Sequence, residues 1–436
     1  MFETGSALTV FVLTLLLIMI RPKWVNEAVA ALLGGSLMLL LGRVHLDEAY
    51  NILIAKWDVF LFFLGLMTIA AVADNAGFFD WAAAVAMKLA GGNGFRLFLN
   101  VFLLGALIST FLSNDATALI LTPVVYTLTT RLRLNPLPFM FACTFIADTA
   151  SFTLPVSNPI NILITGAFPQ TQSLGAFLQH LLAASLIAIA LNILFFVIIF
   201  RKQLPRRFSP DDMEQPVKII EQKGRSYFWF VSASLGVIAI GYVLASLFHI
   251  PLSFVGLGGS LILVVGTAFF GRLSFRRLGG EISWPIFLFI GGMFIVVQGV
   301  ENTGVTREMG RLLVNSAGSS PLLAVLLSTF GTAIGANLIN NVPMALVMIS
   351  ALQQVDLSSI TPAVHNGLIY SSILGADLGP NLTTAGSLAT ILWLLILRRK
   401  GMEVSPLQYF KLGVLVTPVM LLAGAGMIWL SLVLFS

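Results

Sequence analysis

The sequence predicts an all-α integral membrane protein with ten transmembrane spans, arranged as two inverted five-span repeats. Three observations lead to this fold: an apolar composition, a set of motifs that recurs along the chain, and a one-sided distribution of basic residues. Of the 436 residues, 58% are hydrophobic and 10% are charged, and the mean hydropathy is +0.96. Soluble domains carry roughly 25% charged residues, so we expect the lipid bilayer to surround this chain and no separate soluble domain.

Long apolar segments cover most of the chain. Several are shorter than the ~20 residues that a span requires, so we expect these spans to extend into the flanking residues. In the first half the segments are 7–20, 28–41, 59–73, 97–130, 138–168 and 177–200. In the second half they are 228–248, 254–270, 285–300, 321–351, 362–397 and 412–435.

The two sets of segments share landmarks at a nearly constant separation. The stretch 57–62 (WDVFLF) is matched 227 residues later by 284–289 (WPIFLF). Asn114 aligns with Asn340 at a separation of 226. Internal repeats are common in secondary transporters. We therefore predict an N-terminal repeat (1–200), a basic linker (201–226) and a C-terminal repeat (227–436).

Each half contains two interrupted apolar units. The segments 97–130 and 321–351 have a polar break near the middle, which predicts re-entrant hairpins. The segments 138–168 and 362–397 contain prolines among polar residues, and proline interrupts the helical hydrogen-bond ladder, so we expect broken helices. With two hairpins set aside, five spans remain in each half, and an odd number of spans makes the halves inverted to one another.

Basic residues indicate the orientation of this topology. Twenty of the 24 Lys and Arg residues lie on one side, and the linker is on that side. Lys and Arg collect in cytoplasmic loops, so we expect a multi-pass protein of the inner (cell) membrane with a cytoplasmic linker and both termini outside. The remaining four basic residues are Arg43, Lys56, Arg307 and Arg311.

The four interruptions are expected to converge near the middle of the membrane and to form a binding site. Hairpin tips and half-helix ends expose unpaired backbone groups, and amides and hydroxyls suit a neutral polyol-like molecule or a hydrated ion. The asparagines could instead pack helices together, and the hydroxyls could instead satisfy broken backbone. The candidate substrate-binding residues are Ser113, Asn114, Thr153, Ser157, Asn158, Asn340, Asn341, Asn381, Thr383 and Thr384.

Three acids lie deep in apolar units, and these units contain no Lys or Arg. They are Asp115, Asp148 and Asp377. A carboxylate at membrane depth costs several kcal/mol unless it has a partner, and burial favours its protonated form, so these residues are candidate proton carriers. The alternative is that each caps a half-helix. Asp115 is the favoured carrier because it aligns with Asn341, so only one repeat can titrate at this position.

Other functional residue types form no recognisable site. The single cysteine, Cys143, is interpreted as a small buried hydrophobic residue. The four histidines share no metal-ligand spacing, so we predict no metal site, no cofactor and no catalytic residues. The net charge of +5 reflects cytoplasmic loops rather than a nucleic-acid partner.

At the interrupted units the sequence resembles the arsenite-efflux permease ArsB family. This family belongs to an ion-transporter superfamily that includes NhaD-type sodium/proton antiporters and dicarboxylate carriers. The likeness extends over nearly the whole chain. It is carried by Asn114-Asp115, 118–123 (ALILTP), 145–151 (FIADTAS), 156–158 (VSN), 340–343 (NNVP), 377–380 (DLGP) and 386–390 (GSLAT).

The resemblance implies a secondary active efflux transporter that exports arsenite or antimonite, as the neutral trihydroxy species, in exchange for protons. Members of the family work alone or with a cytoplasmic arsenite-stimulated ATPase. Two positions depart from the family pattern: Asn381 stands where many relatives carry Lys, and Thr384-Ala385 where they carry Pro-Ile. The alternatives are a sodium/proton antiporter on the same fold and, more distantly, a membrane-embedded enzyme.

Overall fold

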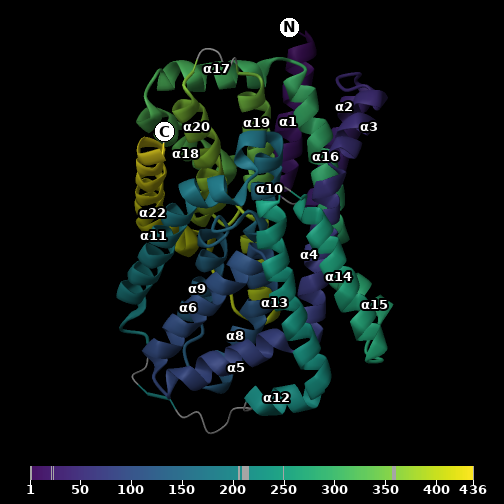
Figure 1. The fold of residues 1–436 in the computed structure, drawn as a ribbon. Coiled ribbons are helices and arrows are strands. Elements are labelled where there is room, and N and C mark those ends of the chain that lie inside the picture. Colours follow the sequence, from purple (N-terminus) through teal and green to yellow (C-terminus); the bar gives the residue numbers. More distant parts are fainter. Residues whose placement is uncertain are drawn as a thin grey trace.

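The protein is built entirely from helices within the part of the chain that the structure describes. This structure is a computed structural model, and it describes residues 2–20, 22, 24–204, 207–208, 216–248, 250–355 and 360–435. Arg21, Lys23, His249 and most of the middle of the predicted linker lie outside these ranges. In Figure 1 the N-terminus and α17 lie at one end of the molecule, and α5 and α12 lie at the other.

The helices of the first half are α1 (Phe2–Ile20), α2 (Glu27–Leu40), α3 (Leu46–Ala55), α4 (Trp57–Asn75), α5 (Phe78–Ala90), α6 (Gly94–Phe111), α7 (Asn114–Ala116), η1 (Thr117–Leu121), α8 (Thr122–Arg131), α9 (Leu137–Thr149), η2 (Pro155–Ser157), α10 (Pro159–Ala167), η3 (Pro169–Thr171) and α11 (Leu174–Phe200). Those that follow are α12 (Pro216–Lys223), α13 (Arg225–Leu247), α14 (Leu252–Phe269), α15 (Phe275–Glu281), α16 (Trp284–Glu301), α17 (Val305–Ala317), α18 (Pro321–Ile339), α19 (Asn341–Gln353), α20 (Pro362–Leu378), η5 (Gly379–Leu382), α21 (Leu388–Arg399) and α22 (Pro406–Phe435).

These helices make the chain a multi-pass membrane protein. Among the described residues, 8 helices are long and apolar enough to cross a membrane: α4, α6, α11, α13, α14, α16, α18 and α22. Shorter apolar helices include α1, α2, α9 and α19. Two of the long helices, α6 and α18, belong to the predicted re-entrant hairpins, so the predicted number of ten spans stays a prediction.

Helical geometry is interrupted where the sequence places proline among polar residues. In the first half α9 ends at Thr149, and α10 begins at Pro159, which needs no hydrogen bond to its nitrogen at a first helical position. In the second half α20 ends at Leu378 and α21 begins at Leu388. Each second half-helix begins with a side-chain N-cap, Asn158 for α10 and a serine for α21.

The two hairpins turn at polar residues. The first bends after α6, where the Ser113 hydroxyl caps α7 by accepting from Ala116 N at 3.0 Å. A π-helical turn, η1, then leads into α8. The second bends at Asn340, whose φ of 74° lies in the left-handed region that asparagine tolerates better than most residues. The amide of Asn340 also caps α19.

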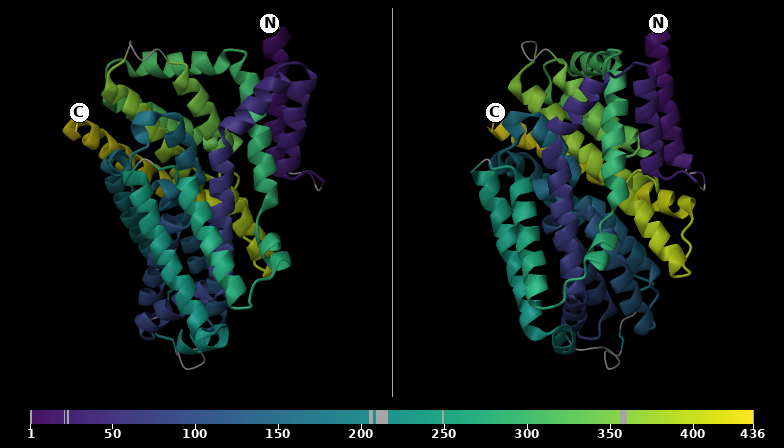
Figure 2. Two further views of the ribbon diagram at one scale, coloured as in Figure 1. Left: turned by 45° about the vertical axis from the view of Figure 1, so that its right-hand side comes forward. Right: turned by 90° about the vertical axis from the view of Figure 1, so that its right-hand side faces the viewer.

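The first two helices of each half pack against the other half. α1 and α2 lie toward one end of the molecule, whereas α13 and α14 extend toward the opposite end (Figures 1 and 2). α2 packs on α16, and α4 packs on α14. Glycine allows both close approaches: a Cβ on Gly65 would lie 2.5 Å from Gly256 C, and one on Gly292 would lie 2.6 Å from Ala31 C. The two glycines are 227 residues apart, the separation at which the sequence motifs recur.

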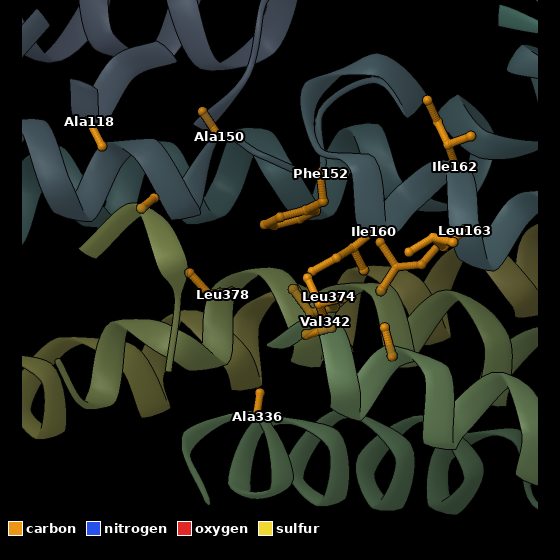
Figure 3. Close-up of a cluster of buried hydrophobic side chains, with 14 of the residues drawn as sticks. Ala118, Ala150, Phe152, Ile160, Ile162, Leu163, Ala336, Val342, Leu374 and Leu378 are labelled. Carbon is orange, nitrogen blue, oxygen red and sulfur yellow. The ribbon is translucent and has the colours of Figure 1, made fainter. Parts of the chain in front are cut away.

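The interrupted helices lie in an apolar core. α18 packs along α20, α10 packs on α19 and α20, and α11 packs along α22. Figure 3 shows part of the buried cluster, with Ile160 from α10, Val342 from α19 and Leu374 from α20. The helix breaks are therefore enclosed by apolar side chains, which leave little water to satisfy their polar groups.

We expect Gly65→Ala to destabilise the protein, because the added methyl group would overlap the α14 backbone. Overpacking of this kind costs about 1–3 kcal/mol. The apparent Tm of the purified protein should fall, and Gly292→Ala should have a similar effect. Gly258→Ala on α14 is the control, because a Cβ there meets nothing within 4 Å. Equal Tm values for Gly65→Ala and Gly258→Ala would contradict the close packing.

Candidate functional site

Asp148, at the end of α9, is the centre of a polar cluster. Its side chain is 1% exposed. Asn114 Nδ2 from the first hairpin tip donates to Asp148 Oδ1 at 3.2 Å, and Ser387 Oγ donates to the same oxygen at 3.2 Å. Thr390 Oγ1 donates to Asp148 Oδ2 at 3.4 Å. Both halves of the chain therefore contribute donors to one carboxylate.

Asp377, at the end of α20, occupies the corresponding place in the second half. It is 0% exposed, and Asn158 Nδ2 from the first half donates to its Oδ1 at 2.6 Å. Within the described residues, its other oxygen, Oδ2, is buried without a hydrogen-bond partner. The Ser151 hydroxyl interacts with this carboxyl group but donates its hydrogen bond to Asp148 O at 2.8 Å, so Oδ2 remains an acceptor.

Reciprocal hydrogen bonds connect the two halves. Asn158 accepts a backbone N–H of α10 at 3.1 Å and donates to Asp377. Ser387 accepts a backbone N–H of α21 at 3.1 Å and donates to Asp148. The residue that caps the second half-helix of each half is thus bonded to the aspartate of the other half. A movement that separates the halves would leave both carboxylates without these donors.

One hydrogen bond breaks this symmetry. Asn114 donates to Asp148, but Asn340, the residue aligned with Asn114, donates to Ala385 O at 3.2 Å instead of to Asp377. Asn341 N donates to Gly386 O at 3.0 Å, and within the described chain Asn341 Oδ1 is buried without a partner. The second half therefore leaves acceptors unsatisfied where the first half has a closed hydrogen bond.

The carboxylate of Asp115 lies outside this hydrogen-bonded network. Its backbone N–H donates to Asn114 Oδ1 at 2.9 Å, and among the described residues no side chain donates to its carboxylate. The side chain is partly exposed and lines two neighbouring cavities of about 230 and 210 Å3. Of the three predicted proton carriers, Asp115 is the one that faces open space.

The remaining predicted residues mostly bond the backbone of the interruptions. Ser157 Oγ donates to Thr110 O at 2.8 Å, which ties the first break to α6. Thr153 Oγ1 donates to Ala150 O at 2.9 Å and lies 2.6 Å from Ser185 Oγ. These contacts match the alternative in which hydroxyls satisfy broken backbone.

The three predicted residues of the second break differ in their contacts. Asn381 crosses to the first half, where its Nδ2 donates to Phe145 O at 3.3 Å and to Thr149 Oγ1 at 3.2 Å. Thr383 Oγ1 stays within its own half and donates to Asn337 Oδ1 at 2.8 Å. Thr384 is half-buried, and no hydrogen bond within the described residues joins it to the network.

Several residues of the network escaped the sequence prediction. Ser387 and Thr390 contact Asp148, although both lie in the predicted broken helix (362–397) and in the stretch 386–390 (GSLAT) that carries the family resemblance. Asn192 lies in the uninterrupted helix α11 and donates to Thr149 Oγ1 at 2.6 Å. A polar residue in the middle of an apolar helix could have indicated it. Asn337 lies one turn before the second tip.

Cys143 and the histidines of the described ranges lie outside the network. Cys143 is free and 0% exposed. His180 Nδ1 lies 2.9 Å from Ser431 Oγ, and His365 Nδ1 lies 3.3 Å from Gln170 Nε2. Within the described residues, no group of three or more His, Cys, Asp or Glu side chains is placed to hold a metal ion.

Interrupted membrane helices whose ends meet at a buried polar cluster are features of a membrane transporter. Among solved structures, the fold of the chain is similar to that of the YdaH transporter of Alcanivorax borkumensis, with a TM-score of 0.62 and 13% identity over 88% of this chain and 86% of that one. This likeness concerns the fold.

Sequence comparisons identify the family. The arsenical pump membrane protein (ArsB) model matches residues 6–430. The arsenical pump membrane protein of Escherichia coli K12 is 32% identical over 425 residues, which cover 96% of this chain and 97% of that protein. A putative arsenical pump membrane protein of Bacillus subtilis is 27% identical and covers 94% of this chain and 96% of its own length. The chain belongs to the ArsB family, which confirms the predicted resemblance.

Ser387→Ala should destabilise the protein at the reciprocal hydrogen bonds between the two halves, because it removes both the cap of α21 and a donor to a buried carboxylate. We expect a loss of about 2 kcal/mol, measured as a lower apparent Tm. Ser372→Ala is the matched control, since that buried hydroxyl donates to Ile369 O in its own helix. Equal apparent Tm values for the two variants would show that the hydrogen bond to Asp148 does not stabilise the protein.

Proposed function

We propose that this protein exports arsenite or antimonite, as the neutral trihydroxy species, in exchange for protons. Membership of a family of arsenical pump membrane proteins supports an arsenical substrate. The observation that carries the finer proposal is the free acceptor at Asp377 Oδ2, in the half of the site where the aligned asparagine donates elsewhere.

The unsatisfied atoms around the breaks favour a ligand that donates hydrogen bonds. Within the described residues, the buried amide oxygens of Asn161, Asn192, Asn341 and Asn381 lack partners, as does Asp377 Oδ2. An amide oxygen can only accept a hydrogen bond, and the same holds for Asp377 Oδ2 when its carboxyl group is ionised. A buried unsatisfied acceptor costs about 1–3 kcal/mol. A neutral trihydroxy molecule brings three O–H donors and no charge to desolvate.

Proton exchange is proposed for the buried carboxyl groups. Within the described residues, Asp148 and Asp377 have no hydrogen bond to a basic side chain, and a carboxyl group that gains a proton becomes a donor at the same place where it was an acceptor. Protonation of Asp377 would therefore remove an acceptor for a substrate O–H. Binding of substrate and of proton would then exclude one another, which is the condition for exchange.

We further propose the orientation and organisation predicted from the sequence. The linker would lie in the cytoplasm, the two repeats (1–200 and 227–436) would enclose the site, and the substrate would leave toward the side of the termini. Each proton that crosses inward with the membrane potential supplies ~2.3 kcal/mol per 100 mV. The chain would therefore need no ATPase, although a cytoplasmic arsenite-stimulated ATPase is a partner compatible with the linker face.

A sodium/proton antiporter is the second candidate. The free oxygens of Asp377 and Asn341 would also suit a cation, because carboxylate and amide oxygens bind hard cations. Growth of arsenite-sensitive cells that express the chain, on arsenite, antimonite and high sodium in parallel, separates the two. Protection against sodium alone would favour the antiporter.

Arsenite uptake into inverted membrane vesicles should require an imposed proton gradient, acid inside. Asp115→Asn and Asp377→Asn should each abolish the gradient-dependent part of uptake, because an amide cannot exchange a proton. Asp47→Asn on α3 is the control, as this acid lies in an exposed first turn far from the breaks in sequence. Equal uptake after collapse of the gradient would contradict proton exchange.

A further inference from the structure

Two cavities meet at Asp115. The larger, about 230 Å3, lies between α4, the first hairpin tip, α10 and the loop that follows α15. The smaller, about 210 Å3, lies between the beginnings of α2 and α16 and the helix α21. Met67, Asp115, Leu119 and Ser283 line both cavities. Asp115 is therefore at a junction, and the larger cavity connects it with a second part of the molecule.

The far end of the larger cavity lies at the linker face. Glu281 lines it and pairs with Arg277 at 2.9 Å, and these side chains are 29% and 55% exposed. Asp74 lines it from the last turn of α4, and the next residue, Asn75, accepts a hydrogen bond from Lys223 Nζ of the linker helix α12 at 3.2 Å.

The inner end of the cavity lies at the interruptions. Ser113 from the hairpin tip and Pro159, the first residue of α10, complete its lining. The lining thus combines charged groups at the linker face with apolar side chains, including Phe63 and Leu66, and with Asp115. A carboxylate without a protein donor costs several kcal/mol in apolar surroundings, so Asp115 must either take up a proton or be reached by water.

We propose that this cavity is the aqueous passage through which Asp115 exchanges protons with the linker side, and that Asp74 is the carboxylate that relays them at its mouth. A proton on Asp115 passes through water to Asp74 and then to bulk solvent on the linker side, and in the exchange proposed above Asp115 takes its next proton from the opposite side. The role of the proton rests on the function proposed above. The passage itself rests on the cavity.

Charged groups from several elements surround the relay. Asp74 interacts electrostatically with Asp80 of α5, with Glu281 and Arg277 of α15, and with Lys223 of α12. When all five groups are ionised, the two cations leave one net negative charge among the three acids, so a change in any of them alters proton transfer. Deeper in the protein, Asp115 interacts electrostatically with Asp148, which links the passage to the reciprocal hydrogen bonds between the two halves.

Cysteine labelling from each side of the membrane tests the passage. In a Cys143→Ala background, Ala70→Cys and Ala71→Cys should react with a membrane-impermeant maleimide added on the linker side, because Ala70 and Ala71 line the cavity. Ala73→Cys is the matched control, since Ala73 is 0% exposed and does not line it. Reaction only from the opposite side, or no reaction beyond that of Ala73→Cys, would overturn the passage.

Asp74 variants test the relay. Asp74→Asn should slow the gradient-dependent flux about tenfold and alter its pH profile, whereas Asp74→Glu should retain both. Equal fluxes and pH profiles for Asp74→Asn and the unaltered protein would remove Asp74 from the relay. The labelling result does not depend on the substrate, so failure of the proposed transport reaction and failure of the passage are distinguishable.

Discussion

The reciprocal hydrogen bonds between the two halves are the interaction on which the site depends. Asn158 and Ser387 each cap a half-helix in their own half and donate to the aspartate of the other half. A single side chain therefore satisfies a helix terminus and a buried carboxylate together. Because both groups would otherwise be unpaired in an apolar core, the two breaks are stable only when they face one another.

Asymmetry makes this arrangement useful for transport. In a fully symmetric site, the asparagine at each hairpin tip would donate to the aspartate of its own half. Here Asn114 donates to Asp148, whereas Asn340 donates to Ala385 O, and Asp377 Oδ2 is left without a hydrogen bond. In the first half, the Asn114 amide therefore supplies a hydrogen bond to the aspartate that has no counterpart in the second half. A donor-rich neutral solute would complete in the second half the bond that Asn114 supplies in the first.

Sequence reasoning predicted the helical membrane fold and the family, because composition, proline and motif spacing are local properties of the chain. It also named the three acids and the capping residue Asn158. It missed Ser387 and Thr390 as partners of Asp148, since a contact between positions more than 230 residues apart depends on how the breaks face one another. It favoured Asp115 by asymmetry alone. The cavities that reach Asp115 depend on side chains from α4, α15 and α16, which lie outside the interrupted units that the sequence singled out.

Proton counterflow in proteoliposomes tests the central claim most directly. Vesicles that contain the purified protein and an entrapped pH dye would receive an arsenite gradient, with no pH gradient at the start. Arsenite moving in one direction should drive protons in the other, and the pH change should disappear in Asp377→Asn. Arsenite flux without any change in internal pH, or a pH change that requires sodium rather than arsenite, would contradict the account.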